Sequence, residues 1–170
     1  LINEWIKEGH EVELIILFDS THSVDVESLI DNRCNKTFLN LKSYRHSIFA
    51  LIKFFYKNKY DFMLVPMWPL TIIAILGWVL NGCNGKLIIS EHTNISVSSS
   101  AEINTPLFLI RLSIFCFYRF ASGIIAVSKG VKYDIENLGK INGDKIKVIY
   151  NPSALGITKP TQNKLKLYSE

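Results

Sequence analysis

Short apolar runs alternate with segments of helical periodicity along the chain. The apolar runs lack regularly alternating polar residues, which is typical of strands buried on both faces of a parallel sheet. The predicted strands are residues 12–18, 37–41, 62–65, 87–90, 124–127 and 145–150. The predicted helices are residues 1–8, 45–57, 69–80, 107–120 and 129–138. This alternation predicts an α/β fold in which crossover helices cover a mostly parallel sheet.

The longest apolar stretch, residues 62–85, contains no charged side chain. It is long enough to cross a bilayer, for which about 20 apolar residues suffice. Pro66 and Pro69 interrupt it, and a proline removes a helical hydrogen-bond donor and pushes the preceding residue towards extended backbone. We therefore expect a buried strand, a turn and a buried helix that ends at Asn81-Gly82. The alternative is an integral membrane protein that spans the bilayer with residues 62–80.

Residues 96–120 are predicted to form a loop followed by a buried helix. The serine-rich segment 96–100 is typical of a mobile loop. Thr105 and Pro106 then predict a helix start, with Thr105 as the N-cap. The helix that follows carries only Arg111 and Arg119 as charged residues. We therefore expect it to be buried on most of its circumference.

The helix predicted over residues 45–57 is amphipathic and has a basic rim. The basic residues and the aromatic residues beside them are Arg45, Lys53, Lys57, Lys59, Phe54, Phe55 and Tyr56. A helix of this kind can lie on an anionic lipid surface. The alternative is an ordinary solvated helix face.

Charge and composition narrow the classes of function. The chain has 19 Lys and Arg against 15 Asp and Glu, and this formal charge of +4 is too small and too dispersed to indicate a nucleic-acid partner. A hydrophobic content of 48% excludes a disordered chain. A length of 170 residues fits one domain. We place this domain at residues 1–150 and a linker at residues 151–170. The three cysteines include no CxxC pair, so neither a zinc site nor a disulfide framework is indicated.

Open parallel sheets bind ligands beyond the carboxyl ends of their strands. The residues with useful chemistry just after predicted strands include Asp19, Ser20, Trp68, Glu91, His92, Thr93, Ser128 and Asn151. His92 is the most reactive, because its imidazole exchanges hydrogen bonds near neutral pH and the adjacent Glu91 carboxylate could raise its basicity. Ser128 could hold a phosphate or a sugar hydroxyl, or act only as a helix N-cap. Trp68 could stack on a sugar ring or fill the core.

Four short motifs follow one another in a characteristic order. They are Gly9-His10-Glu11-Val12, His92-Thr93, Ile124-Ile-Ala-Val-Ser-Lys-Gly-Val131 and Asp144-Lys-Ile-Lys-Val-Ile-Tyr-Asn-Pro152. In this order they resemble the family-4 glycosyltransferases of GT-B architecture, and specifically the N-terminal, acceptor-side domain of that family. The resemblance spans nearly the whole chain. It implies a Rossmann-like three-layer domain, the N-terminal half of a GT-B fold.

The resemblance also implies a function. It points to an enzyme that transfers a sugar from a nucleotide-sugar donor to a lipid-linked or glycan acceptor with retention of configuration. By position, His92 would face the donor sugar, Ser128 would line the cleft, and Asn151 would lead towards a second domain. No cofactor is expected, since the nucleotide-sugar is a substrate, and the GT-B architecture usually requires no metal. The implied location is cytoplasmic, with peripheral contact to the inner face of the cytoplasmic membrane.

Two parts of the family pattern are missing from the sequence. One is the glycine-rich loop after the first strand, and the other is the C-terminal domain whose paired glutamates and basic residues hold the nucleotide diphosphate. We therefore expect donor binding mainly through that second domain, and no turnover by the isolated chain. The alternative is a non-catalytic α/β binding or regulatory domain, since a fold alone does not determine function.

Overall fold

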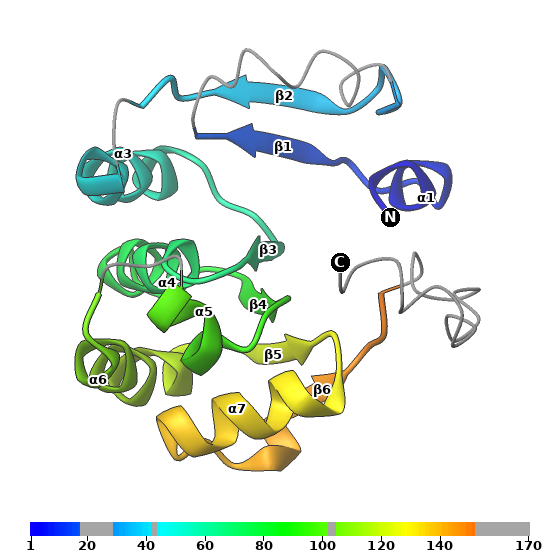
Figure 1. Cartoon of the computed structure of the whole chain (residues 1–170). Coiled ribbons are helices and arrows are strands. Elements are labelled where there is room, and N and C mark those ends of the chain that lie inside the picture. Colours follow the sequence, from blue (N-terminus) through cyan, green and yellow to red (C-terminus); the bar gives the residue numbers. More distant parts are fainter. Residues whose placement is uncertain (18–28, 42–43, 102–104, 152–170) are drawn as a thin grey trace, which may run out of the picture.

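Strands and helices alternate along the chain as the sequence predicts (Figure 1). The computed structural model describes residues 1–17, 29–41, 44–101 and 105–151. The helices in this part are α1 (Ile2–Lys7), α3 (Tyr44–Lys57), α4 (Leu70–Leu80), α5 (Ile95–Ala101), α6 (Leu107–Phe117) and α7 (Lys129–Gly139), with short 3-10 helices η1 (Tyr118–Phe120) and η2 (Gly143–Lys145). The strands are β1 (Glu13–Ile16), β2 (Asn35–Phe38), β3 (Phe62–Pro66), β4 (Lys86–Glu91), β5 (Gly123–Ala126) and β6 (Ile146–Val148).

The strands form two sheets, one in the order β1-β2 and the other in the order β3-β4-β5-β6. Every pair among the described strands is parallel, which confirms the predicted α/β class. The two sheets are joined by side chains rather than by strand pairing. The hydroxyl of Tyr60, just before β3, donates to the carboxylate of Glu13 in β1, and this carboxylate also accepts the hydroxyl of Thr37 in β2, within its own sheet.

Four helices form one layer against the four-stranded sheet. The strands β3, β4, β5 and β6 are neighbours in chain order, so right-handed crossovers place their connecting helices on the same face. Within this layer α3 packs on α4, α4 on α6, and α6 on α7, whereas α1 lies beside β1, away from them (Figure 1). The fully buried apolar residues between the layer and the sheet include Ile75, Leu87, Ile89, Ile110, Ile114, Ile124 and Ile135.

The apolar stretch 62–85 folds as predicted into a strand, a turn and a helix. The expectation that this strand is buried is wrong, because Phe62, Leu64 and Pro66 are exposed and only one face of β3 is covered. Pro66 ends β3, and α4 is an 11-residue helix that ends at Leu80. None of the helices in the described part of the chain combines the length and the apolar character that a membrane crossing requires.

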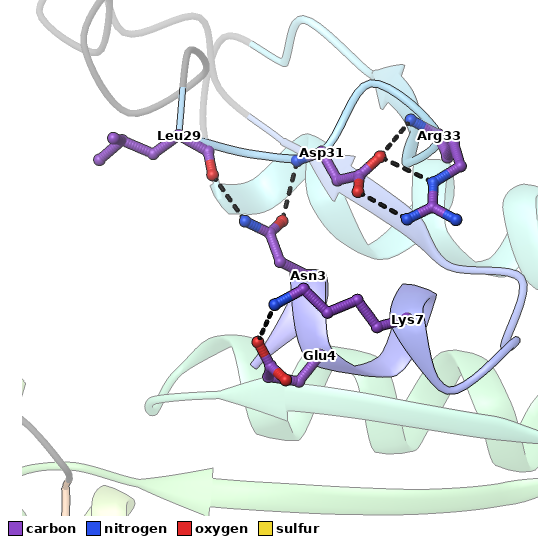
Figure 2. Close-up of polar contacts among 6 residues, drawn as sticks. All are labelled: Asn3, Glu4, Lys7, Leu29, Asp31 and Arg33. Atoms are coloured by element: carbon purple, nitrogen blue, oxygen red, sulfur yellow. Dashed lines mark hydrogen bonds and ion pairs between the residues drawn. The ribbon is translucent and has the colours of Figure 1, made fainter.

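Helix α1 is fixed to the segment before β2 by polar contacts (Figure 2). The side-chain amide of Asn3 donates to the carbonyl of Leu29 and accepts from the backbone N–H of Asp31, both at 2.8 Å. The Arg33 guanidinium binds both carboxylate oxygens of Asp31, at 2.9 and 3.1 Å, and holds the pKa of that carboxyl down at about 2. Asn3 of α1 therefore binds two residues of one segment, which lie 26 and 28 positions away from it.

The predicted loop over residues 96–100 is wrong, because these residues belong to α5. Ile95 is buried against the core, and the backbone N–H of Ser96 donates to the Asp134 carboxylate of α7 at 3.0 Å. These tertiary contacts stabilise a helix that its serine-rich composition does not favour.

Two expectations for the helix after Thr105 are also wrong. Its N-cap is Pro106, without a side-chain capping bond, and within α6 only Ile110 and Ile114 are buried. The flanking helices α4 and α7 cover the inner side of α6, and its outer side remains exposed although it is apolar.

The predicted amphipathic helix is present as α3, but two of its aromatic residues do not lie on the basic rim. Phe54 and Phe55 are buried in the core, whereas Phe49 and Tyr56 are exposed. Asp19, Ser20 and the predicted linker after Asn151 lie outside the described residues, so these expectations remain predictions.

Candidate functional site

The strand register brings the predicted site residues to one edge of the four-stranded sheet. The backbone N–H of Met67 donates to the Ser90 carbonyl at 2.8 Å, and that of Val127 donates to the Glu91 carbonyl at 3.2 Å. On the far side of β5, the N–H of Ile149 donates to the Ala126 carbonyl at 3.0 Å. The carboxyl ends of β3, β4, β5 and β6 therefore lie side by side, where parallel sheets bind ligands.

His92 lies exposed at this edge, directly after β4. Its Nε2 is 3.1 Å from the hydroxyl oxygen of Ser90, which is itself buried. Residues two apart in a strand share a face, so Ser90 is placed to hold the ring through this nitrogen. An imidazole held in this way presents its other nitrogen to the edge of the sheet and can exchange a hydrogen bond or a proton with a ligand there.

Glu91 points to the opposite face, towards the helix layer, and only 1% of its surface is exposed. Its Oε2 accepts the backbone N–H of Trp68 at 3.2 Å, and its Oε1 accepts the hydroxyls of Thr71, at 3.2 Å, and of Tyr118. Burial raises the pKa of the Glu91 carboxyl, and the three donors only partly offset this shift because they favour the charged form. We call Glu91, Trp68, Thr71 and Tyr118 the Glu91 cluster.

The same cluster raises the pKa of Tyr118 well above its usual value. Burial is the main cause, and the neighbouring Glu91 charge adds to it, because a tyrosinate beside a carboxylate would place two negative charges in the core. Tyr118 therefore acts in this cluster as a hydrogen-bond donor.

Trp68 lies with its side chain against the core rather than over the open edge. Its indole N–H donates to the hydroxyl of Ser113 in α6 at 3.2 Å, and the ring packs against the main hydrophobic cluster. Of the two interpretations of this residue, the geometry favours the structural one.

The remaining predicted residues lie on neighbouring strand ends. Ser128 follows β5 and caps α7, because its hydroxyl oxygen accepts the N–H of Val131 at 3.2 Å. Thr93 is exposed beside His92, and Asn151 is exposed beyond β6. His92, Thr93 and Ser128 thus end two adjacent strands, β4 and β5, which makes this part of the edge the candidate site.

The sequence did not identify three residues that hydrogen-bond to the predicted site residues: Ser90, Thr71 and Tyr118. Ser90 has a signal in the sequence, since strand alternation puts it on the face of His92. Thr71 is the only hydroxyl-bearing residue of the apolar helix α4. Tyr118 has no local signal, because it reaches Glu91 across 27 positions of sequence.

The described residues contain no group of three or more His, Cys, Asp or Glu side chains that could hold a metal ion. The polar groups that this edge offers to a ligand include the imidazole of His92 and the hydroxyl of Thr93, with the exposed ammonium of Lys129 nearby at the start of α7.

Comparison with known proteins assigns the chain to a family. The family model for Glycosyltransferase Family 4 matches residues 1–153. No curated protein matches the chain. Among solved structures, the chain is similar to a lipopolysaccharide outer core galactosyltransferase, WaaB, in its apo form, with a TM-score of 0.55 and 12% sequence identity.

The structural likeness covers 84% of this chain and 46% of that enzyme, so the chain spans less than half of the enzyme's length. At this level of identity the likeness shows the fold, a Rossmann-like domain of the GT-B type. The match to the family model extends over nearly the whole chain, from its first residue to Ser153, and the chain therefore belongs to glycosyltransferase family 4.

Proposed function

We propose that this chain is the acceptor-side part of an enzyme that transfers a sugar from a nucleotide-sugar to a lipid-linked or glycan acceptor with retention of configuration. In this reaction the bond between the anomeric carbon and the diphosphate oxygen breaks, and a bond from the acceptor oxygen to that carbon forms. The nucleoside diphosphate leaves, and its oxygen accepts the proton that the acceptor hydroxyl loses. The observation that carries the proposal is the exposed His92 at the carboxyl end of β4 in a family-4 domain.

The proposed role of His92 is to hydrogen-bond the reacting sugar. Positive charge develops on the sugar as the bond to the diphosphate breaks. The rate also depends on how the sugar is positioned relative to the acceptor, and a hydrogen bond to a sugar hydroxyl helps to fix that position. The contact with Ser90 limits the rotation of the ring and thereby preorganises the imidazole. A polar group positioned in this way contributes about 100-fold to a rate.

We propose that a second domain binds the donor diphosphate. A diphosphate needs several cationic or N–H donors around it. In the described segments that follow β3, β4, β5 and β6, Lys129 is the only Lys or Arg, and it is exposed. The similar galactosyltransferase is also more than twice as long as the region it shares with this chain. We place the enzyme in the cytoplasm, at the inner face of the cytoplasmic membrane, and propose that it needs no metal ion.

The test compares two histidine variants of the enzyme that contains this chain. We expect His92→Ala to lower kcat about 100-fold with an unchanged unfolding midpoint. His10→Ala is the matched control, because His10 is exposed and lies before β1, at the opposite end of the strands. Equal turnover of His92→Ala and the parent enzyme at saturating donor and acceptor would remove His92 from the mechanism.

The proposed division between domains has its own test, calorimetric titration of residues 1–170 with a panel of nucleoside diphosphate sugars. We expect no micromolar binding to this chain alone, since one exposed lysine in open solvent is screened by salt. Micromolar binding would place the donor site on this chain.

A further inference from the structure

The outer face of helices α3, α4 and α6 is apolar and carries only positive charge. On α6 and η1, five of the exposed positions form one stripe at helical spacing: Phe108, Arg111, Leu112, Phe115 and Arg119. Leu107, Leu109 and Phe120 are exposed beside it. Phe108, Leu112 and Phe115 expose 66%, 55% and 43% of their surface. This stripe lies opposite Ile110 and Ile114, which face the core.

Helix α3, at one end of the layer, repeats the pattern. Its exposed stripe consists of Phe49, Lys53, Tyr56 and Lys57, and Phe49 and Tyr56 expose 77% and 79% of their surface. Between the two stripes lies α4, which has no charged residue and ends in the exposed Leu80. Because α3 packs on α4 and α4 on α6, the three outer surfaces belong to one side of the molecule (Figure 1). We call them together the basic-apolar face.

No Asp or Glu occurs in α3, α4, α6 or η1, although the chain contains 15 of them. The neighbouring helix α7, in contrast, includes both Asp134 and Glu136. Large exposed apolar patches mark interaction sites. The positive charge around this patch favours a partner of negative charge.

From this geometry we infer that the basic-apolar face binds an anionic lipid bilayer, with the aromatic and leucine side chains in the headgroup region and Lys53, Lys57, Arg111 and Arg119 at lipid phosphates. Apolar side chains flanked by basic ones are what an interfacial lipid-binding surface requires. A second copy of the chain fits less well, because a symmetric contact would place arginine against arginine without an acid to pair with it. This inference rests on the proposed transfer to a lipid-linked acceptor, and it names the surface that brings the enzyme to that acceptor.

The structure also relocates the lipid contact expected from the sequence. Phe54 and Phe55 of the predicted rim are buried, and the larger part of the exposed apolar surface lies on α6 instead. Substitutions on α6 should therefore have a greater effect on lipid binding than substitutions on α3.

Vesicle flotation of the chain tests the inference, with phosphatidylcholine vesicles compared with vesicles that also contain phosphatidylglycerol. We expect binding to the anionic vesicles only, and weaker binding as salt is raised. Arg111→Glu should reduce partitioning at least about fivefold, since each basic residue near an anionic surface contributes about that factor. The double variant Phe108→Ser/Leu112→Ser should reduce it about tenfold or more, because burial of apolar area drives this binding.

Two control variants carry the same types of change elsewhere. Tyr133→Ser removes an exposed aromatic residue of α7, and Lys147→Glu reverses an exposed charge of β6. Both should bind vesicles like the parent chain. Circular dichroism of each variant should show the parent's unfolding midpoint, because every substituted residue is exposed.

The outcomes separate this inference from the proposed function. His92→Ala should float with anionic vesicles like the parent, and the α6 variants should retain transfer to a water-soluble acceptor. Absence of parent binding to anionic vesicles, or equal binding to neutral ones, would overturn the lipid inference without affecting the transfer reaction. A dimer in sedimentation that the α6 variants abolish, without any vesicle binding, would assign the face to a second copy.

Discussion

The two faces of β4 at its carboxyl end have opposite chemistry. On one face, the buried Ser90 contacts the exposed His92, which a ligand can reach. On the other, Glu91 is buried and both of its carboxylate oxygens are occupied by donors from the protein. Consecutive residues of a strand point to opposite faces, so residues adjacent in sequence acquire different roles.

The two faces therefore have different roles: His92 can bind a ligand, whereas Glu91 positions the backbone around it. Glu91 joins the segment after β3, the start of α4 and the start of η1 to the strand that His92 directly follows. It has no exposed surface that a sugar could contact, so its carboxylate acts on the site through the backbone that it holds. The following changes test whether the two faces are as distinct as the geometry indicates.

The largest effect is expected from Glu91→Ala. This change leaves the Trp68 N–H and the hydroxyls of Thr71 and Tyr118 without their acceptor, and each unpaired buried group costs about 1 kcal/mol or more. We expect the free energy of unfolding to fall by about 3 kcal/mol, measured by urea denaturation. Glu11→Ala, at an exposed acid, is the control and should change it by less than about 0.5 kcal/mol. Should Glu91→Ala fail to fold, Glu91→Gln, which keeps one acceptor oxygen, should still be measurably less stable than the parent.

The pH dependence of stability provides a second test of the buried carboxyl. Its pKa is raised in the folded chain from the ordinary value of 4.5, so the folded state holds this proton more tightly than the unfolded state does. The stability that the protonated Glu91 contributes is complete below the ordinary value and declines as the pH rises through the raised one. We expect the difference in unfolding free energy between the parent and Glu91→Gln to shrink over this range. A difference that grows with pH would show that the donors outweigh burial and that the carboxyl is held in its charged form.

A smaller loss is expected from Tyr118→Phe. The change removes one donor from Glu91 and retains the aromatic packing, so we expect a cost of about 1 kcal/mol in urea denaturation. Thr71→Val should cost a similar amount. The Thr71 hydroxyl lies 2.8 Å from the Tyr118 hydroxyl as well as near Glu91, so the double variant should differ from the sum of the two. Additive costs would show that the three groups do not form one network.

The smallest effect is expected on the open face, from Ser90→Ala. Loss of this contact frees the His92 ring to rotate, so we expect kcat to fall about threefold while the free energy of unfolding changes little. The kcat/KM for donor and acceptor should be compared with that of Ser128→Ala, which removes a helix cap and should lower stability by about 1 kcal/mol. A drop in stability without a change in kcat for Ser90→Ala would indicate that Ser90 has only a structural role.

Local features of the sequence predicted those helices and strands whose bounds depend on nearby residues. Pro66 and Pro69 divide an apolar stretch that otherwise matches a membrane span, and β3 and α4 begin and end where the prolines indicate. Strand periodicity and the rule for parallel sheets also predicted where His92 and Ser128 would lie, because both depend only on where a strand ends.

The wrong expectations concern segments whose environment is made by distant residues. Residues 96–100 are helical because Ile95 is buried and Ser96 is bonded to Asp134, 38 positions away. Helix α6 looks buried by composition, but the neighbouring helices cover only one side of it. The composition of a helix shows how apolar it is but does not show how many other helices or strands pack against it.

The sequence by itself determined the α/β class, the family resemblance and the edge of the sheet that carries the candidate site, since these follow from periodicity, proline positions and short motifs. Only the tertiary structure decided that Glu91 is buried, that Trp68 turns towards Ser113, and that α6 leaves an apolar stripe in solvent. The physical reason is that burial and hydrogen bonding depend on which segments pack together. The partners of Glu91 and Trp68 lie 20 to 45 positions away in the sequence, and no local pattern encodes those contacts.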